Sequence, residues 1–299
     1  MATRALRTGD AEQSYVERRP RPGLARLASS VWIQQIAPGA APYRQLHIPT
    51  GGAELTCRLG DVPSVRGPST APVTETLPAG TTVVGIRLHP TATAATFGLP
   101  ADALRAVVVD LESLWGDLGR MVTERVTSLP SPEAALAALQ DRLLARIPLS
   151  DPPDRLVTAA VRQLRQDVSV AALGERLDIS ERQLRRRCET AVGLAPKTLH
   201  RLLRFQRFVA RTQRDLAVTP RDARPRTIAS LAAEVGYADE AHLSRECVRL
   251  TGRTPAAFLA VAEQQCACGH DHAASYAPQL AGDGSRPSSG STGDGQRRR

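Results

Sequence analysis

The sequence predicts an α+β protein with a β-rich N-terminal domain, connecting helices and an all-α C-terminal domain. Between residues 24 and 89, apolar and polar side chains alternate, which is typical of half-buried strands. After Thr91 the apolar spacing changes to three and four residues, which is typical of amphipathic helices. Residues 169–260 then contain one helical unit twice, and this repeat organises the C-terminal part of the chain.

These changes in pattern divide the chain of 299 residues into two domains flanked by tails. The expected segments are a disordered leader at 1–22, a β-rich domain with connecting helices at 23–150, a helical domain at 151–262, and a disordered tail with a Cys/His cluster at 263–299. The β-rich segment is the candidate sensor and dimerisation domain.

Three expected stretches of strand fill the β-rich segment. They are residues 27–36, residues 43–59 with Gly51-Gly52 as a hairpin turn, and residues 72–90 with a second turn at Pro78–Gly80. Together they predict a small, mostly antiparallel β domain.

Helices are expected next, because the apolar positions now fall on one face. Their ranges are Thr91–Phe97, Ala101–Ala106, Leu111–Ser128, Ser131–Arg146 and Asp154–Arg165. The apolar faces of these helices predict packing, either on the β domain or on a second subunit. A homodimer is therefore a candidate assembly.

The repeated unit spans Ser169–Leu199 in its first copy and Thr227–Leu259 in its second, a period of about 59 residues. Apolar, cysteine, glycine and proline positions agree between the copies. The matching pairs are Val170/Ile228, Leu173/Leu231, Leu177/Val235, Leu184/Leu243, Arg186/Arg245, Cys188/Cys247, Gly193/Gly252 and Pro196/Pro255.

Each copy has the pattern of two short helices joined by a turn. In the first copy, Ser169 and Ser180 are placed to cap the two helices, and Asp178-Ile179 forms the turn. In the second copy, Gly236 supplies the turn and Asp239 the cap. This is a helix-turn-helix arrangement, in which the second helix lays its outward face into a DNA major groove.

The outward faces of the two second helices supply the candidate DNA contacts. The residues expected to face base edges are Arg182, Arg185 and Arg186 in the first copy, and Glu240, Ala241, Ser244 and Arg245 in the second. The arginines are the leading candidates for bidentate contacts with guanine. Ser180, Arg201 and Arg204 are expected to hold phosphates and set the register.

This pattern resembles the AraC-type transcription regulators over about the last third of the chain. Their hallmark is two helix-turn-helix units joined by a long helix, with Gly-x-x-Pro after each second helix. Gly193–Pro196 and Gly252–Pro255 supply both motifs, and Leu199–Asp215 would be the joining helix. The resemblance implies double-stranded DNA as partner, and RNA polymerase is a further candidate.

One departure from the family pattern is that Cys188 and Cys247 stand where phenylalanine is usual, and Leu243 replaces another common phenylalanine. Each change removes core volume, so we expect compensation elsewhere in the core. A free cysteine usually behaves as a small buried apolar group, which favours packing. The duplicated cysteine also permits a thiol-sensing interpretation.

The N-terminal half also resembles an uncharacterised domain that accompanies a subset of these regulators, on segments such as His47–Gly60 and Leu111–Gly119. Many family members sense a ligand in a barrel-like N-terminal domain, so the resemblance implies a barrel-like fold and an unknown small-molecule effector. The candidates to line a pocket are Trp32, His47, Arg87, His89 and Trp115.

The overall charge of the chain points to a polyanionic partner, because the formal net charge is +9 and the pI is near 10.1. DNA is the first candidate and an anionic membrane surface the second. No stretch is apolar enough to span a membrane, and the N-terminus lacks the apolar core of a signal peptide. These features predict a cytoplasmic protein, and five cysteines give no disulfide framework.

Cys266, Cys268, His270 and His272 form a cluster of soft and borderline donors, for which zinc is the candidate metal. Their alternating spacing is unusual for a structural zinc site. The rival functions are a metal- or thiol-responsive sensor that uses this cluster, and a β-domain enzyme with a regulatory tail. The sequence contains none of the common nucleophile, phosphate-loop or metalloprotease motifs, so we expect no enzyme.

Overall fold

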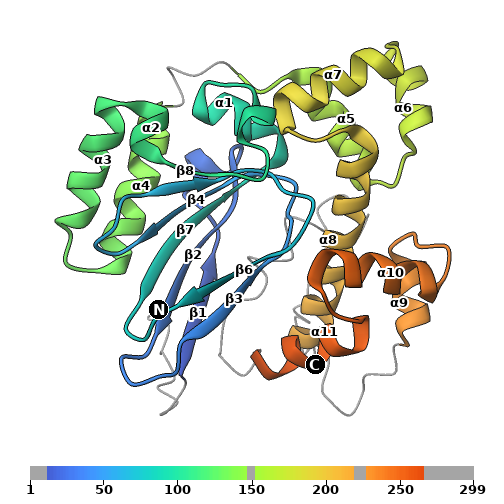
Figure 1. Cartoon of the computed structure of the whole chain (residues 1–299). Coiled ribbons are helices and arrows are strands. Elements are labelled where there is room, and N and C mark those ends of the chain that lie inside the picture. Colours follow the sequence, from blue (N-terminus) through green and yellow to red (C-terminus); the bar gives the residue numbers. More distant parts are fainter. Residues whose placement is uncertain (1–11, 147–151, 219–226, 266–299) are drawn as a thin grey trace, which may run out of the picture.

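The computed structural model describes residues 12–146, 152–218 and 227–265. Its N-terminal half is built on a six-stranded sheet with the order β1-β2-β7-β4-β5-β8 (Figure 1). The strands are β1 (Gln13–Arg18), β2 (Ala28–Ile36), β4 (Glu54–Arg58), β5 (Ser64–Arg66), β7 (Thr82–Leu88) and β8 (Val108–Asp110). All neighbouring strands are antiparallel, as the sequence predicts. The expected β-rich domain is present. Its large sheet is open, with β1 and β8 at its edges, and does not close into a barrel.

The pairing of the remaining strands differs from the expected hairpins. β3 (Tyr43–His47) pairs with β6 (Val73–Leu77) in a separate two-stranded sheet, so neither Gly51-Gly52 nor Pro78–Gly80 closes a hairpin. Gly51 has a φ of +86°, and a Cβ on Gly52 would lie 2.5 Å from the carbonyl oxygen of Leu88. The two glycines therefore let the chain pass from one sheet to the other against the end of β7.

The leader is partly structured, in contrast to the expectation of disorder up to residue 22. Strand β1 pairs with β2 over its whole length. Two side-chain interactions explain its order: Glu17 receives a hydrogen bond from Arg87 at 2.8 Å, and the ring of Tyr15 lies 5.8 Å from that of Trp32.

Of the four helices that follow, the last three lie on one side of the large sheet, and the first lies at the end of the sheet toward the C-terminal half (Figure 1). They are α1 (Thr93–Phe97), α2 (Leu111–Trp115), α3 (Asp117–Thr127) and α4 (Pro132–Arg146), with short 3-10 turns η1 (Pro22–Leu24), η2 (Pro90–Ala92) and η3 (Ala101–Leu104). The helix expected at 111–128 breaks at Gly116, whose φ is +56°. Leu136, Leu139 and Leu143 of α4 join the core of the sheet, so this helix packs on the β domain of its own chain.

The C-terminal half contains both expected helix pairs. They are α6 (Val170–Leu177) with α7 (Glu181–Val192), and α9 (Ile228–Glu234) with α10 (Glu240–Thr251). The other helices are α5 (Arg155–Arg165), α8 (Pro196–Val218) and α11 (Pro255–Gln265). The joining helix α8 begins at Pro196, which suits the first helical position because its missing N–H would have no partner there.

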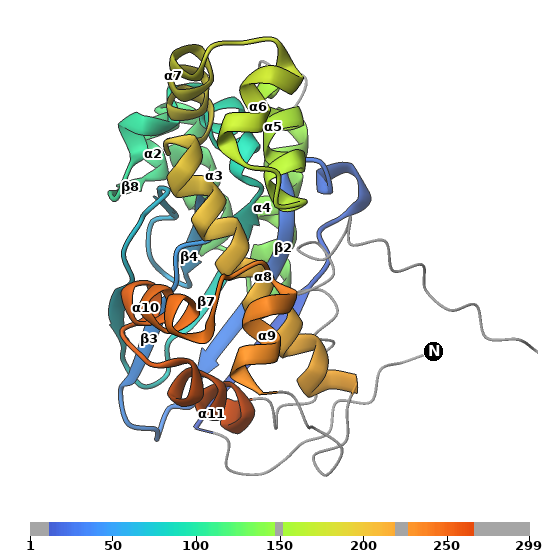
Figure 2. The same cartoon turned by 90° about the vertical axis from the view of Figure 1, so that its right-hand side faces the viewer.

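One hydrophobic core unites the C-terminal helices, and Figure 2 shows the two helix pairs placed along the length of α8. Phe205 and Phe208 of α8 are fully buried, and Phe258 of α11 packs against both rings. These rings fill the centre of a core in which Cys188 and Cys247 are also fully buried. In the described part of the chain, no helix is both long and apolar enough to cross a bilayer.

Candidate nucleic-acid interface

Residues at the two ends of helix α7 cap it. Ser180 and Gln183 form a capping box, in which the Ser180 hydroxyl accepts from the backbone N–H of Gln183 at 3.2 Å and the side-chain Oε1 of Gln183 accepts from the backbone N–H of Ser180 at 3.0 Å. Gly193 ends the helix in the left-handed conformation with a φ of +82°. Leu184 and Cys188 face the core, which turns the arginines of the helix outward.

The outward face of α7 carries three of the expected base contacts. Arg182, Arg185 and Arg186 are all exposed. Arg185 donates to the carboxylate of Glu189 at 3.1 Å, whereas Arg182 and Arg186 form no ion pair with the described residues. The face therefore presents at least two guanidinium groups whose hydrogen-bond donors are available to another molecule.

Helix α10 presents a much less basic face. Asp239 caps it by accepting from the His242 N–H at 2.6 Å, and Gly252 ends it with a φ of +72°. Of the expected contacts, Glu240, Ala241 and Arg245 are exposed, and Ser244 is half-buried. Arg245 is the single arginine among them.

The three expected phosphate contacts all have internal partners. Ser180 uses its hydroxyl in the capping box. Arg201 of α8 donates to Glu246 of α10, with one N–O distance of 3.3 Å, and Arg204 donates to Asp167 at 2.8 Å. A phosphate would have to compete with these bonds, and the role of the three residues in DNA binding stays a prediction.

A row of arginines on α8 instead ties the helices of the domain together. Arg207 donates to the carbonyl oxygen of Arg165 in α5, and Arg211 pairs with Glu234 of α9 at 3.1 Å. With Arg201 and Arg204, these residues connect α8 to α5, α9, α10 and the turn before α6. The sequence pattern places them on one helix but does not show their partners.

Asp167 is a structural link that the sequence analysis missed. It adopts a φ of +63° in the turn between α5 and α6, and it accepts from His200 at 2.8 Å as well as from Arg204. A Cβ on Gly236, in the turn of the second helix pair, would lie 2.4 Å from its carboxylate. Asp167 therefore sits where the first helix pair, α8 and the second helix pair meet.

The carboxylate of Glu246 is almost entirely buried, with 6% of the residue exposed. Burial alone would raise its pKa, but hydrogen bonds and charge from Arg201 and Arg249 outweigh burial and lower the pKa. Glu246 is thus ionised at neutral pH and fixes α10 against α8.

The two repeated cysteines have the properties of core residues. Both are fully buried. Burial, followed by the nearby carboxylates of Asp154 and Glu189, raises the pKa of the Cys188 thiol to about 12, and burial also raises the pKa of Cys247. Since the thiolate is the reactive form, these surroundings favour packing over thiol sensing.

The candidate pocket residues of the N-terminal half do not converge on one site. Trp32, His47 and Arg87 surround a cavity of about 190 Å³ beside α8, in which Arg87 is held by Glu17 and Glu54. His89 lines a separate, larger cavity, and Trp115 packs against Phe97. The cluster Cys266, Cys268, His270 and His272 lies outside the described residues.

Comparison with known families gives two matches. Residues 173–260 match a family described as a helix-turn-helix domain, and residues 16–110 match a domain of unknown function, DUF6597. No curated protein matches the sequence.

Among solved structures, the chain is similar to ToxT from Vibrio cholerae. One ToxT crystal structure at 1.65 Å resolution is 10% identical, with a TM-score of 0.39 over 83% of this chain and 97% of that one. A ToxT structure bound to (E)-4-(8-methylnaphthalen-1-yl)but-3-enoic acid is 10% identical, with a TM-score of 0.40 over 83% and 97% of the two chains. An apo variant from strain SCE256 is 8% identical, with a TM-score of 0.38 over 85% and 98%.

Proposed function

We propose that this chain is a DNA-binding transcription regulator with an AraC-type helix-turn-helix domain, and that it reads duplex DNA with two units at once. The observation that carries the proposal is the pair of matched helices α7 and α10 on a single joining helix. Both have 12 residues, a side-chain cap and a left-handed terminal glycine. Two equivalent outward faces on one body suit two neighbouring segments of major groove.

The length of α8 supports this spacing. It has 23 residues, which correspond to about 34 Å of helix. One turn of B-form DNA also has a length of about 34 Å, so units at the two ends of such a helix would meet successive major-groove segments on one face of the duplex. The arginine contacts of α8 to the second helix pair and to the turn before α6 favour a fixed spacing.

Within each unit, the roles of the side chains follow from their chemistry. We assign Arg182, Arg186 and Arg245 to base edges, because exposed guanidinium groups can form bidentate hydrogen bonds with guanine. Glu240, Ala241 and Ser244 would set the preference of the second unit for other bases. Ser180, Arg201 and Arg204 remain the proposed phosphate contacts, on condition that DNA replaces their internal partners.

We further propose that the N-terminal half modulates DNA binding, because it contacts the reading domain directly. Arg105 donates to the carbonyl oxygen of Gly193 at 2.7 Å, at the end of α7. Gln206 of α8 donates to the carbonyl oxygen of Pro49 at 2.7 Å. A signal that shifts the β domain would therefore move the end of the first reading helix and the middle of the joining helix.

The effector, RNA polymerase and a second copy of the chain are proposed partners, on the resemblance to the family. The cytoplasm is the proposed location. The zinc site at Cys266–His272 stays a proposal that metal analysis of the full chain, with and without residues 263–299, would test.

The experiment is selection of binding sites from random duplex DNA by the intact protein, followed by titration of a recovered site against random duplex at two salt concentrations. We expect the recovered site to bind about a thousandfold more tightly than random DNA. Binding that is uniform over sequences and falls steeply with salt would show that the arginines only neutralise phosphate, and would contradict the proposal.

A further inference from the structure

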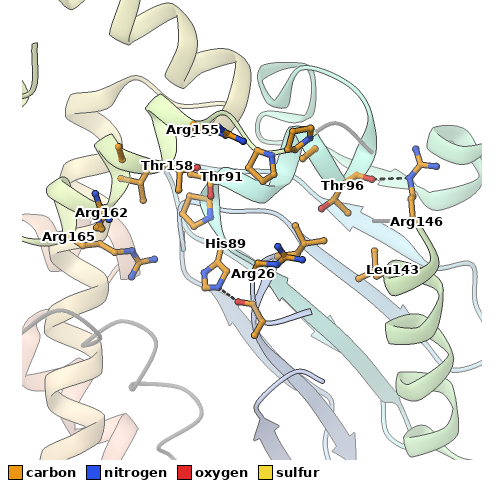
Figure 3. Close-up of a pocket in the computed structure, with 18 residues that line it drawn as sticks. Arg26, His89, Thr91, Thr96, Leu143, Arg146, Arg155, Thr158, Arg162 and Arg165 are labelled. Atoms are coloured by element: carbon orange, nitrogen blue, oxygen red, sulfur yellow. Dashed lines mark hydrogen bonds between the residues drawn. The ribbon is translucent and has the colours of Figure 1, made fainter. Parts of the chain in front are cut away.

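Asp167 lies just after helix α5, the first helix of the DNA-binding half. One face of α5 is buried in the hydrophobic core of that half. On another face, Arg155, Arg162 and Arg165 line a cavity of about 740 Å³ that the helix shares with the N-terminal half (Figure 3). The turn after α5, residues 166–169, therefore starts from a helix that is anchored in the core, and it leads into the first helix pair.

Asp167 occupies a backbone position where glycine is usual. Helix α5 ends in a Schellman motif, in which the Asp167 N–H donates to the carbonyl oxygen of Leu164 at 3.1 Å. The Val168 N–H donates to the carbonyl oxygen of Gln163 at 3.1 Å. The first of these donors adopts the left-handed conformation, with a φ of +63°, which glycine reaches without steric cost. The backbone alone would favour glycine here, so the reason for an aspartate lies in its side chain.

The carboxylate of Asp167 binds two donors of the joining helix through one oxygen. Its Oδ1 accepts from Nε2 of His200 at 2.8 Å, and from Nη2 and Nε of Arg204 at 2.8 and 3.2 Å. The two donors are four residues apart and share one face of α8. Burial lowers the pKa of His200, so its ring is neutral at neutral pH, and Nε2 carries the proton because a carboxylate only accepts. Asp167 thereby fixes the turn before α6 to the middle of α8.

The second oxygen of the same carboxylate lies against the second helix pair. A Cβ on Gly236, in the turn between α9 and α10, would lie 2.4 Å from Oδ2 of Asp167. Gly236 also has a φ of +86°, so two independent constraints favour glycine there. Asp167 and Gly236 thus form a direct contact between the turn before the first helix pair and the turn within the second.

Two ring contacts continue from Arg204 to the second reading helix. The guanidinium carbon of Arg204 lies 5.7 Å from the centre of the Tyr237 ring, a distance at which a cation is attracted to an aromatic face. Tyr237 is buried, and its ring meets that of His242 edge-on, with 5.1 Å between the ring centres. His242 belongs to the first turn of α10. The carboxylate of Asp167 is therefore linked to α10 through Arg204 and Tyr237.

Two ion pairs hold the second helix pair on α8 itself. Arg201 donates to Glu246 of α10 at 3.3 Å, and Arg211 pairs with Glu234 of α9 at 3.1 Å. Asp167 reaches the second helix pair from the side of the first. It therefore limits how far the second unit can turn about the axis of α8.

We propose that Asp167 is a positioning residue, which sets the angle of α10 relative to α7 and thereby the spacing of the two DNA segments that the protein accepts. This role rests on the proposed function, because it concerns how two units read one site. It requires Arg204 to stay on Asp167 in the DNA complex. It is therefore the alternative to a phosphate contact by Arg204, in which DNA would take the place of Asp167.

The test compares D167G with the wild type on three duplexes, which are a selected site and the same site with one base pair added or removed between the recognised segments. Each change turns one segment by about 35° and moves it by about 3.4 Å. We expect the intact wild-type protein to bind the altered sites about tenfold more weakly than the selected site, and D167G to lose less than about threefold. Glycine is the usual residue at this end of a helix, so D167G keeps the backbone of the turn, and circular dichroism verifies its fold.

D178G is the matched control. Asp178 also has a positive φ, of +51°, in the turn between α6 and α7, but its side chain is exposed and forms no ion pair with the described residues. Like D167G, this variant removes one carboxylate from a left-handed residue, so its loss of charge changes the affinity for all three duplexes equally. The ratios between the duplexes should remain those of the wild type.

Chemical unfolding tests the contact with Gly236 in the absence of DNA. G236A should lower the free energy of unfolding less in D167G than in the wild type, because D167G lacks the carboxylate that the new Cβ would meet. G252A should cost the same in both backgrounds. Gly252 also has a positive φ, of +72°, and nothing in the described part of the chain lies within 4 Å of its Cβ position.

Three results would overturn the role of Asp167. They are D167G that discriminates between the duplexes as sharply as the wild type, the same loss of discrimination in D178G, and an equal cost of G236A in the two backgrounds. The first result, together with tighter binding of D167G to all three duplexes, would show that Arg204 leaves Asp167 to hold a phosphate. A wild type without any preferred site would instead overturn the proposed function, and with it the role of Asp167 in spacing, even where unfolding confirms the contact.

Discussion

The two proposed reading helices, α7 and α10, share their length, a side-chain cap and a left-handed terminal glycine, but they differ in charge. Arg182, Arg185 and Arg186 of α7 correspond to Ala241, Ser244 and Arg245 of α10. Only the last of these positions keeps its arginine in both copies. The comparison separates a position that carries arginine in both proposed reading helices, Arg186 and Arg245, from two arginines that only the first unit carries, which give that unit the stronger attraction to polyanionic DNA.

The surroundings of the two helices also differ. Gly193 at the end of α7 lies against the N-terminal half, where a Cβ would be 2.7 Å from the carbonyl oxygen of Ala101. Gly252 at the end of α10 has no such neighbour within 4 Å in the described part of the chain. The first unit is therefore in direct contact with the β domain at the end of α7, and the arginine contacts of α8 connect it to the second unit.

The largest expected effect is a difference between G193A and G252A. Both glycines have positive φ values, so alanine should cost about 1–2 kcal/mol of stability at either position. At Gly193 the contact with Ala101 adds overpacking, for a total of about 2–5 kcal/mol. Chemical unfolding of both variants measures this. Equal losses would show that the N-terminal half does not press on the end of α7.

DNA binding should respond to the shared arginine in both units. R186A and R245A should each weaken binding to a selected site by about 1–3 kcal/mol and relax specificity at one base position. R182A should act in the same way, whereas R185A should reduce the salt dependence and affect all sequences similarly, because Glu189 already holds Arg185. Titrations of selected and random duplex measure both effects. Equal losses of R186A on the two duplexes would identify Arg186 as a phosphate contact.

At one equivalent position the two helices carry opposite charges, and this difference predicts a pH-dependent contribution to stability. Arg187 of α7 pairs with Asp154 at 3.0 Å, whereas the equivalent Glu246 of α10 pairs with Arg201 and Arg249. Because the folded state lowers the pKa of Glu246, its stabilisation is present above the unfolded pKa and is lost as pH falls through the folded pKa. E246Q should therefore flatten the loss of stability from about pH 5 to pH 3. Unfolding curves across that range measure the free energy of unfolding at each pH. The same loss of stability at low pH with and without E246Q would contradict the lowered pKa of Glu246.

The smallest expected effect concerns the caps. S180A and D239A should each cost about 1 kcal/mol, because each removes an acceptor for an N–H in the first turn. S180A also breaks the reciprocal bond with Gln183, so its cost should be slightly the larger. Thermal unfolding of the two variants measures the difference, and no loss in either would show that water replaces the caps.

Local signals made the C-terminal half predictable. The caps at Ser169, Ser180 and Asp239 and the glycine at 236 act on neighbouring residues, so their effects can be inferred from spacing alone. Because the helical unit is repeated, the pattern of caps and turn could be checked in two copies. The same reasoning underestimated β1, because its order comes from Arg87 and Trp32, which are distant in sequence.

Features that depend on distant partners could not be predicted. Alternation in residues 43–59 indicates strands, but it does not show that β3 pairs with β6. The spacing of Arg201 and Arg204 places them on one face of α8, and only the fold brings Glu246 and Asp167 to them. In the same way, the large cavity joins Arg26 and Arg165, which belong to different halves of the chain.

The central claim is that two units at a fixed spacing read one site, and the spacing of the DNA tests it most directly. In a selected site, 5 base pairs are inserted between the two recognised segments, and binding of the intact protein is titrated. The account predicts a loss of about a hundredfold, because the second segment turns to the opposite face of the duplex and α8 cannot follow it. Unchanged affinity would contradict the account and show that one unit reads the site alone.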